Sequence, residues 1–300
     1  MKIRASARND VHGWVVLDKP AGMTSTHAVT RLKRIFNAKK AGHAGTLDPL
    51  ATGVLPVAFG EATKTVPFVQ DGEKIYRFTV RWGAETDTGD SDGRVAAHSN
   101  ARPAVAGILA LLPRFTGTIQ QQPPSYSAIK INGERAYDLA RGGQAPVLPP
   151  RAVTIHALDL IDAGRDEAVF EARCGKGTYV RAIARDLGRS LGCYGHVSAL
   201  RRTRVGPFYE TDAVILPDLD DDASRAQALR RVEAGLMALP RVMVDRDSAA
   251  KLRRGQSILL RGHDAPFDGF AYAACCGVVI AVGAVEKGEL IPGRVFNLPL

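Results

Sequence analysis

The chain has 300 residues, 45% of them hydrophobic, and a formal net charge of +9. This length suits one large domain with a smaller one, or two domains, and the hydrophobic content excludes a wholly disordered chain. So basic a balance favours a polyanionic partner such as a nucleic acid, while an aromatic content of 6% argues against a broad base-stacking platform.

Cysteine spacing and the chain ends exclude further classes. No Cys-x-x-Cys pair or His-Cys cluster occurs, which predicts no zinc site and favours a reducing, cytoplasmic location. Cys275 and Cys276 lie in an apolar run and are expected to be buried thiols. The N-terminus lacks the apolar core of a secretory signal, and the run from Phe270 to Val285 is too short for a membrane helix, so it predicts two strands.

The N-terminal part predicts a strand followed by a helix. Residues 14–17 read as a short buried strand, and Ser25 or Thr26 can cap a helix that buries Val29, Leu32 and Phe36. The other face of this helix and the residues after it are basic, from Arg31 to Lys40. A solvated face and a phosphate-contacting face both remain open for this segment.

The run from His43 to Leu55 places one carboxylate, Asp48, between Leu47 and Pro49, with glycines on both sides. Pro49 disfavours helix at Asp48, and the glycines permit tight turns and close approach of a ligand. The sequence therefore predicts a carboxylate on a stiff loop, either in an Asx-type turn or in a catalytic site.

Residues 75–82 alternate as a strand, with Tyr76, Phe78, Val80 and Trp82 on one face. Tyr76 can mark the edge of a pocket or be a plain core tyrosine. The acidic run from Asp87 to Gly93 lacks the spacing of a calcium loop and is interpreted as a polar turn.

The middle of the chain predicts a short helix over residues 104–112 and then an excursion from the sheet. Residues 120–149 are bracketed by prolines and glycines, which predicts a long ordered loop with a short helix.

Residues 169–174 predict a strand that turns at Gly175 to Thr178 into a helix from Tyr179. The turn is not a phosphate-binding P-loop, because Phe170 occupies the position that needs glycine. The helix carries Arg181, Arg185 and Arg189 at four-residue spacing. Like charges so spaced are mildly unfavourable, as is a cation in the first helical turn, which suggests that the stripe faces an anion. Because both penalties are small on an exposed helix face, a stripe that is simply solvated remains open.

An acidic connector over residues 216–222 precedes a mostly helical stretch over 223–239. From Pro240, short apolar runs alternate with glycines, which predicts a small β barrel. We therefore expect a first domain over residues 1–236, with the excursion as an insertion at about 120–150, and a second over 240–300.

Four motifs together resemble the TruB-type pseudouridine synthases, the bacterial stand-alone enzymes that modify transfer RNA. They are the run from His43 to Leu55 and the segments 13–20, 175–181 and 200–203, in the family's order. The resemblance extends from about residue 12 to about residue 210. It implies an α+β fold in which helices flank a mixed sheet, followed by a small PUA-like β domain for RNA binding.

The resemblance also implies roles for single residues. Asp48 would be the nucleophile, Arg181 its ion-pair partner, and Tyr76 would stack on the target uracil and help to move a proton from its carbon five. The positions of His43, Lys19, Tyr179 and Leu200 match those that bind the substrate. An opposite charge nearby favours the ionised form of a carboxylate, and a carboxylate can act as a covalent nucleophile.

The implied substrate is uridine 55 in the TΨC stem-loop of transfer RNA, with no cofactor, metal, guide RNA or obligatory protein partner, and a monomer is expected. Basic clusters at residues 31–40 and 201–204 predict strongly salt-dependent RNA binding. Three alternatives remain: an accompanying RNA-folding chaperone role, a guide-RNA-dependent relative, and a glycosylase that releases free uracil.

Overall fold

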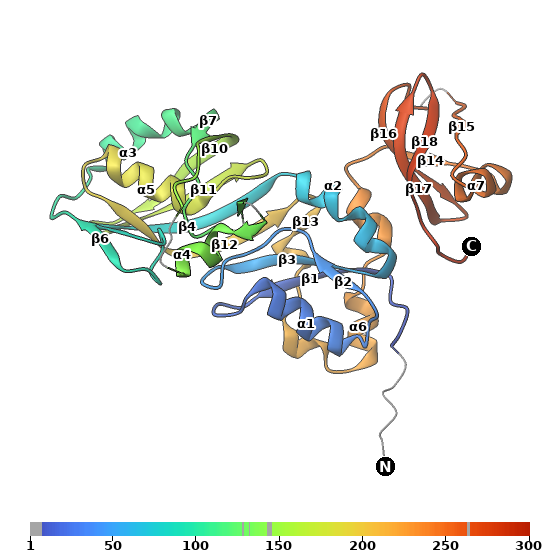
Figure 1. Cartoon of the computed structure of the whole chain (residues 1–300), viewed down its shortest axis with the longest axis horizontal. Helices are drawn as coiled ribbons and strands as arrows, with labels where there is room; N and C mark the ends of the chain where they lie inside the picture. Colours follow the sequence, from blue (N-terminus) through green and yellow to red (C-terminus); the bar gives the residue numbers. More distant parts are fainter. Residues whose placement is uncertain (1–7, 128, 132, 143–145, 263–264) are drawn as a thin grey trace, which may run out of the picture.

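The computed structural model describes residues 8–127, 129–131, 133–142, 146–262 and 265–300. They form a nine-stranded mixed sheet flanked by helices and a second sheet of five strands in a separate lobe (Figure 1). The predicted α+β class, with a smaller β unit at the C-terminal end, is confirmed.

The larger sheet has the strand order β1-β3-β12-β4-β11-β10-β7, with β2 paired to β3 and β13 paired to β12. Neighbours are antiparallel except β3 and β12, which run parallel. The strands are β1 (Gly13–Lys19), β2 (Ala41–His43), β3 (Thr52–Phe59), β4 (Lys74–Trp82), β7 (Gly117–Gln121), β10 (Arg151–Ala163), β11 (Glu167–Cys174), β12 (Gly195–Val205) and β13 (Phe208–Tyr209).

The alternation predicted for residues 75–82 is confirmed in β4. Phe78, Val80 and Trp82 are buried, and Tyr76 at the start of the same face is half-buried. Phe78 lies opposite Phe170 of β11, and their ring centroids are 5.5 Å apart in a stacked arrangement. This cross-strand pair fixes the centre of the sheet beside the cavity described below.

Helices lie at both ends of the sheet (Figure 1). The predicted cap of α1 is wrong by one or two residues, because Thr24 is the N-cap and its hydroxyl accepts a hydrogen bond from the His27 amide at 3.1 Å. The helices are α1 (Ser25–Ile35), α2 (Val66–Asp71), α3 (Val105–Leu111), α4 (Ala136–Arg141), α5 (Val180–Ser190), α6 (Asp222–Ala228) and α7 (Arg246–Arg253), with 3-10 turns η1 (Gly60–Thr65), η2 (Leu112–Phe115), η3 (Glu210–Asp212), η4 (Leu216–Leu219) and η5 (Val232–Leu236).

The helical stretch predicted over residues 223–239 is interrupted. The helix α6 ends before Leu229, because the backbone of Arg230 pairs with Trp14 of β1 through two hydrogen bonds of 2.8 and 2.7 Å. This pairing draws the chain away from the helix axis, and only η5 follows.

Three smaller sheets complete the described strands. The C-terminal lobe has the order β14-β16-β17-β18-β15, with α7 packed against it. The excursion at 120–150 carries the hairpin β8–β9 and the short α4. The remaining bounds are β5 (Ala84–Thr86), β6 (Val95–His98), β8 (Lys130–Ile131), β9 (Glu134–Arg135), β14 (Arg241–Met243), β15 (Ile258–Leu259), β16 (Gly269–Cys275), β17 (Val278–Glu286) and β18 (Glu289–Val295).

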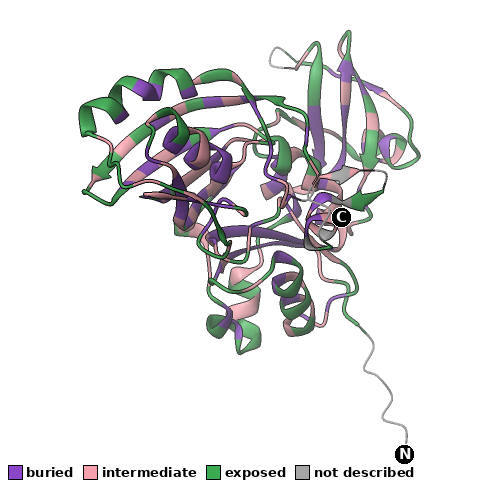
Figure 2. Cartoon of the chain, turned by 60° about the vertical axis from the view of Figure 1, so that its left-hand side comes forward, coloured by how far each residue is buried: buried purple, intermediate pink, exposed green. Residues whose placement is uncertain are grey.

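The C-terminal lobe packs against the larger sheet through a shared hydrophobic cluster. Trp14 and Val16 of β1 belong to the same buried cluster as Tyr272, Val279 and Phe296 of the lobe. Figure 2 shows buried segments both in the larger sheet and in the strands of the lobe. The predicted boundary near residue 240 separates two sheets that share part of their core.

Candidate active site

The loop between β2 and β3 carries Asp48 and is held from both sides. Ser25 at the start of α1 accepts a hydrogen bond from the Leu47 amide at 2.8 Å and donates one to the Leu47 carbonyl at 3.0 Å. The Gly22 amide donates to the Pro49 carbonyl at 2.8 Å. Asp48 therefore lies between two anchored neighbours, on a loop that is stiff, as the sequence predicts.

Arg202 of β12 anchors the same loop from the sheet side. Its guanidinium donates to the carbonyls of Val54 at 2.9 Å, Gly45 at 3.1 Å and Thr46 at 3.2 Å, and the residue is only 1% exposed. Gly53 permits this close approach. A Cβ at Gly53 would lie 2.3 Å from the Arg202 carbonyl oxygen, and its φ of +98° also favours glycine.

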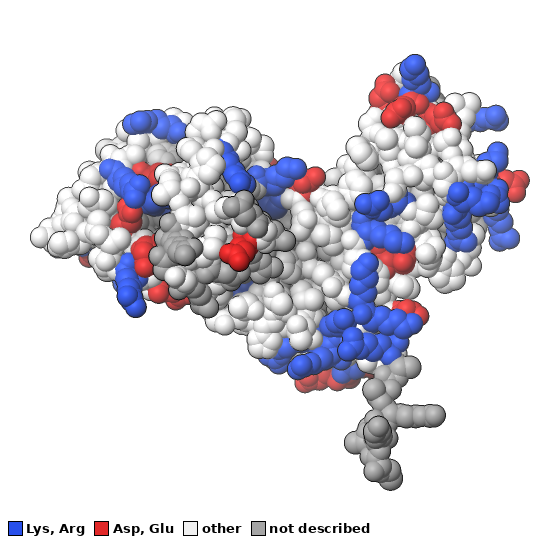
Figure 3. All heavy atoms as spheres, viewed as in Figure 1, with Lys and Arg blue, Asp and Glu red and all other residues white. Residues whose placement is uncertain are grey.

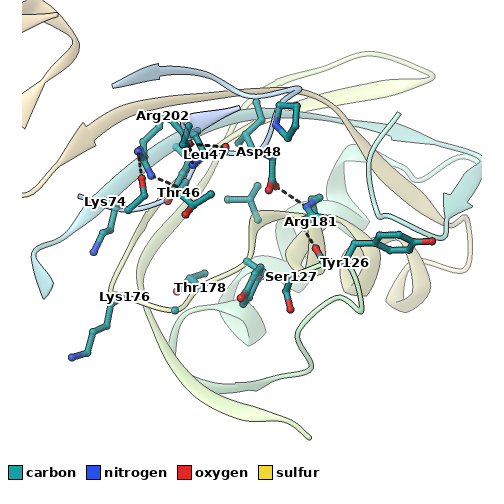
Figure 4. A pocket seen from close by; sticks show the side chains of 18 of the residues that line it. Thr46, Leu47, Asp48, Lys74, Tyr126, Ser127, Lys176, Thr178, Arg181 and Arg202 are labelled. Atoms are coloured by element: carbon teal, nitrogen blue, oxygen red, sulfur yellow. Dashed lines mark hydrogen bonds and ion pairs between the residues drawn. The ribbon is translucent and has the colours of Figure 1, made fainter. Parts of the chain in front are cut away.

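Asp48 and Arg181 form an ion pair, as predicted (Figure 4). The distance from Asp48 Oδ2 to Arg181 Nε is 2.9 Å. The other guanidinium nitrogens donate to the carbonyls of Thr88 at 2.7 Å and Tyr126 at 2.9 Å. Because Arg181 has partners on three sides, its charge is fixed in position beneath Asp48.

A second carboxylate on Arg181 was not predicted. Asp90 Oδ2 lies 3.7 Å from Arg181 Nε, and Asp90 is buried. Its Oδ1 accepts hydrogen bonds from the Thr88 hydroxyl at 2.6 Å and the Asp92 amide at 3.2 Å. The run from Asp87 to Gly93 is therefore more than a polar turn, because it delivers a buried acid to the candidate site.

Asp48 and Arg181 border a cavity of about 520 Å³. Asp48, Tyr76, Tyr179, Arg181 and Leu200 all line it, so the structure brings together five of the predicted site residues. The excursion at 120–150 supplies one wall of this cavity. The wall residues from this segment include Tyr126, Ser127 and Tyr137, and the Tyr126 and Tyr137 rings meet edge to face at 6.1 Å.

The root of this wall is tied to the start of α5. The Gln121 side chain accepts from the Tyr179 amide at 2.8 Å and donates to the Tyr179 carbonyl at 3.2 Å. The Gln121 side-chain amide thus satisfies both backbone groups of Tyr179, as a neighbouring strand would. Tyr179 lies two residues before Arg181, so this contact also helps to position the start of α5.

Tyr76 and Tyr179 present their rings to the cavity. Burial raises the pKa of Tyr76, and the nearby Arg202 charge opposes this effect. Burial also raises the pKa of Tyr179. Both side chains therefore keep their phenol protons at neutral pH and offer flat, uncharged surfaces for stacking.

Lys19 lies beneath the Asp48 loop and does not line the described cavity. Its ammonium donates to the carbonyls of Pro20 and Met23, both at 2.8 Å, and of Pro49 at 3.3 Å. Burial lowers the pKa of Lys19 to about 8, and the Asp48 charge opposes this shift. Its geometry indicates support of the loop rather than the substrate contact that the resemblance implies.

His43 also lies outside the described lining of the cavity. It is the last residue of β2, where it pairs with Val57 of β3. Its predicted contact with substrate stays a prediction.

At the far end of the cavity from Asp48 are two lysines, Lys74 and Lys176 (Figure 4). Lys74 is buried and donates to the carbonyls of Gln70 and Gly72, and burial lowers its pKa to about 8. Lys176 is exposed and pairs with Asp71 at 2.9 Å.

The arginine stripe of α5 does face anions, but they belong to the protein. Besides the contacts of Arg181, Arg185 pairs with Asp186 at 2.8 Å, and Arg189 forms two bonds of 2.6 and 2.7 Å with Glu85. The stripe therefore stabilises the fold around the site and is not a free basic surface.

The predicted basic cluster at residues 201–204 is likewise not a free phosphate-binding surface. Arg201 forms two bonds of 3.0 and 2.9 Å with Asp18, and Arg204 pairs with Glu73 at 3.1 Å. Arg202 is buried. Neighbouring carboxylates and carbonyls satisfy all three guanidinium groups. The sequence does not predict these pairs, because the acidic partners Asp18 and Glu73 lie far from the arginines along the chain.

In the described part of the chain, no three His, Cys, Asp or Glu side chains lie close enough to hold a metal ion. Within the same residues, no helix has the length and apolar character needed to cross a membrane.

What the arrangement can do chemically follows from its walls. A carboxylate held by a buried guanidinium borders a cavity whose lining includes the apolar side chain of Leu200 and the phenol rings of Tyr76, Tyr126, Tyr137 and Tyr179. Such a site can accept a flat heterocycle by stacking and attack it, or its attached sugar, through a carboxylate oxygen.

Two family models match the chain. Residues 33–180 match the TruB family pseudouridylate synthase (N terminal domain), and residues 181–251 match the tRNA pseudouridylate synthase B C-terminal domain. The proteins named tRNA pseudouridine synthase B from Rhodopseudomonas palustris and Bradyrhizobium diazoefficiens are 60% and 62% identical to it. Each alignment covers 97% of this chain and 82% or 87% of the relative.

Solved structures share the fold over nearly the whole chain. The "Crystal Structure of a Cbf5-Nop10-Gar1 Complex" matches with a TM-score of 0.73 and 25% identity, covering 95% of this chain and 84% of that one. The "Structure of H/ACA RNP bound to a substrate RNA containing 2'-deoxyuridine" matches with a TM-score of 0.74 and 22% identity, covering 99% and 92%.

Proposed function

The chain belongs to the TruB family of pseudouridylate synthases, and we propose that it isomerises a uridine of transfer RNA to pseudouridine. The proposed target is uridine 55 in the TΨC loop, which the motifs around Asp48 and Arg181 support by resemblance. The observation that carries the reaction class is the Asp48 carboxylate, which is ion-paired with Arg181 at the wall of the cavity.

Access of the target base requires base flipping. A base inside a folded RNA loop must leave its stack, at a cost of a few kcal/mol. Stacking of the flipped base on an aromatic side chain such as Tyr76 can offset roughly 1–3 kcal/mol of this cost. A cavity of about 520 Å³ has room for a nucleoside.

In the proposed reaction, Asp48 attacks the nucleoside covalently and divides a difficult step into two. The bond between the ribose and uracil N1 breaks, the bond between the ribose and C5 forms, and the bond to Asp48 breaks again. C5 loses its proton, and N1 takes up a proton in its place. Because no atoms are gained or lost overall, the reaction needs no redox carrier. Arg181 holds the Asp48 carboxylate in place. Tyr76 stacks on the base and helps to move the proton from C5.

Release of tritium from a transfer RNA transcript containing 5-tritiated uridine tests this proposal. Purified protein should release tritium from the complete transcript and lose that release when uridine 55 is replaced by cytidine. Free uracil in the products would instead indicate a glycosylase. Activity that appears only after a guide RNA or protein is added would overturn the proposed stand-alone monomer.

The exposed cations near α1 are the proposed phosphate contacts. Arg31, Arg34 and Lys40 are exposed, and Lys and Arg gather beside α1 and on the C-terminal lobe (Figure 3). Each phosphate neutralised steepens the dependence of log affinity on log salt concentration by roughly 0.7–0.9. An affinity that stays flat between low and physiological salt would exclude phosphate-dominated binding.

An accompanying chaperone role is also proposed, since flipping and refolding the loop would use the same surface. A catalytically inactive Asp48→Asn protein should then still speed refolding of a misfolded transcript. Refolding no faster than without protein would contradict this role.

A further inference from the structure

Two adjacent thiols lie at the hairpin turn between β16 and β17. The sequence predicts that both are buried, and this is wrong for Cys276, which is exposed, whereas Cys275 is 2% exposed. Cys275 pairs with Val278 across the hairpin, so Cys276 and Gly277 are the two central residues of the turn.

The turn directs the two thiols to the same side. Successive side chains of a strand point to opposite faces, which would separate them. Here Cys276 has φ +50° and Gly277 φ +79°, as in a type I′ turn, and the Cys275 and Cys276 sulfur atoms are 3.8 Å apart. A positive φ is uncommon for cysteine, so this placement is a specific feature of the turn.

This spacing suits chelation better than a disulfide. Consecutive Cα atoms are about 3.8 Å apart, below the usual range of about 4.4–6.8 Å for bridged cysteines, so a bond between adjacent cysteines is strained. In contrast, two sulfur atoms bound at about 2.3 Å to one centre lie roughly 3.3–3.8 Å apart, the lower value for the near-right-angled bonds of a pyramidal centre and the upper value for tetrahedral bonds, so only a small closing of the pair is needed. The thiols can therefore bind a common centre with little backbone movement.

The rest of the turn is fixed. Cys275 belongs to the buried cluster with Ala249 and Leu252 of α7. The Gly277 carbonyl accepts a hydrogen bond from Arg231, in the segment that leads to η5. A pair held in this way loses little conformational freedom when it chelates a ligand.

We propose that Cys275 and Cys276 form a two-thiol binding site for a trivalent organic arsenical. Zinc and similar ions need further ligands, and no set of three suitable side chains lies together among the described residues. An organic arsenoxide needs only two. Its As=O oxygen takes both thiol protons and leaves as water, two As–S bonds form, and no oxidant or reductant is required.

Phenylarsine oxide is the probe, added to the full-length protein in excess monothiol and followed by native mass spectrometry. One adduct per chain, with loss of water and of two titratable thiols, is expected. Cys276→Ser removes an exposed sulfur and should weaken binding about 100-fold or more, because a chelate gains a large effective concentration from its second arm. Cys193→Ser, at a buried thiol outside the turn, is the matched control and should bind as wild type.

A dithiol competitor should remove the adduct, and an equivalent concentration of monothiol should not. Wild-type protein that takes up no adduct, or Cys276→Ser protein that binds as tightly as wild type, would overturn the proposal. Cys275→Ser is a second variant with the same expected loss. A circular-dichroism spectrum first tests whether Cys275→Ser folds. If Cys275→Ser does not fold, the Cys276→Ser result alone decides the proposal.

Discussion

The Asp48 carboxylate meets the Arg181 guanidinium at 2.9 Å, yet the Asp48 side chain is 36% exposed and the Arg181 side chain only 7%. The acid is therefore open to the cavity, while its cation is packed among protein carbonyls. A ligand can reach one partner without displacing the other.

Replacing Asp48 with Asn keeps its size and removes its charge. Turnover should fall to background, because no other carboxylate lines the described cavity. RNA affinity should stay within about tenfold, roughly 1.4 kcal/mol, because the proposed phosphate contacts and base stacking do not involve the Asp48 charge. Tritium release and filter binding measure the two effects. Asp159→Asn, at an exposed site on β10, is the control, and substantial turnover by Asp48→Asn would sink the mechanism.

Replacing Asp90 with Asn tests the second carboxylate on Arg181. Without this charge the guanidinium is held less firmly under Asp48, so kcat should fall by about tenfold or more, a barrier increase of about 1.4 kcal/mol. RNA affinity should not change, because Asp90 is buried. Asp92→Asn changes an exposed neighbour in the same turn and should keep full activity. Equal losses in both variants would indicate a general defect of the turn.

Replacing Gly53 with Ala tests the close approach of β12 to the Asp48 loop. The new Cβ would lie 2.3 Å from the Arg202 carbonyl oxygen, so β12 must shift and the anchor on the loop must weaken. Gly117→Ala is the matched control, because Gly117 has a similar φ of +84° with open space around it. The control should lose about 1–2 kcal/mol of unfolding free energy from backbone strain alone. Gly53→Ala should lose more, together with turnover, in urea unfolding and tritium release.

The buried Lys19 makes stability depend on pH in a definite direction. Its pKa is lowered to about 8 from 10.5, so between these values the unfolded chain binds more protons and the unfolding free energy rises with pH. Lys19→Met should flatten the curve in this window by up to about 1.4 kcal/mol per pH unit. Urea titrations from pH 7.5 to 10.5 measure the slope. The control Lys251→Met, on the exposed surface of α7, should keep the wild-type slope of unfolding free energy against pH. A Lys19→Met slope equal to that of wild type would contradict the assignment of this pH dependence to Lys19.

Replacing Phe296 with Ala tests the shared core of the two lobes. Phe296 is fully buried in the cluster that contains Trp14, so its loss should cost about 3–5 kcal/mol. Both lobes should unfold together at lower urea, as reported by tryptophan fluorescence for the larger sheet and by far-UV circular dichroism for the whole chain. Phe267→Ala, at a residue that is 66% exposed, should change stability little. Separate transitions would show that the lobes are energetically independent.

Local pattern predicts the parts of this fold that depend on neighbouring residues. The alternation in β4, the helix after Tyr179 and the stiff loop around Asp48 all follow from periodicity and from proline and glycine chemistry. The end of α6 does not, because it depends on pairing between Arg230 and Trp14, which lie far apart in the sequence.

Charged groups show the same limit more sharply. A row of arginines on α5 has the same sequence pattern whether it binds RNA or protein carboxylates. Only the folded chain shows that Glu85 and Asp90 reach Arg189 and Arg181. The sequence does not predict the contact of Asp90 with Arg181. The turn lacks a metal-binding pattern, and a single acidic residue in a polar turn gives no indication of which cation it will meet.

The carbonyl of Tyr126 accepts a hydrogen bond from Arg181, so the wall of the cavity and the guanidinium that pairs with Asp48 share one contact. Any movement of the Tyr126 backbone away from Arg181 would leave a guanidinium N–H without its acceptor, beside the Asp48 ion pair. At the root of the same wall, the Gln121 side chain forms two hydrogen bonds with the Tyr179 backbone. The position of this wall and the charge environment of Asp48 are therefore coupled through Arg181.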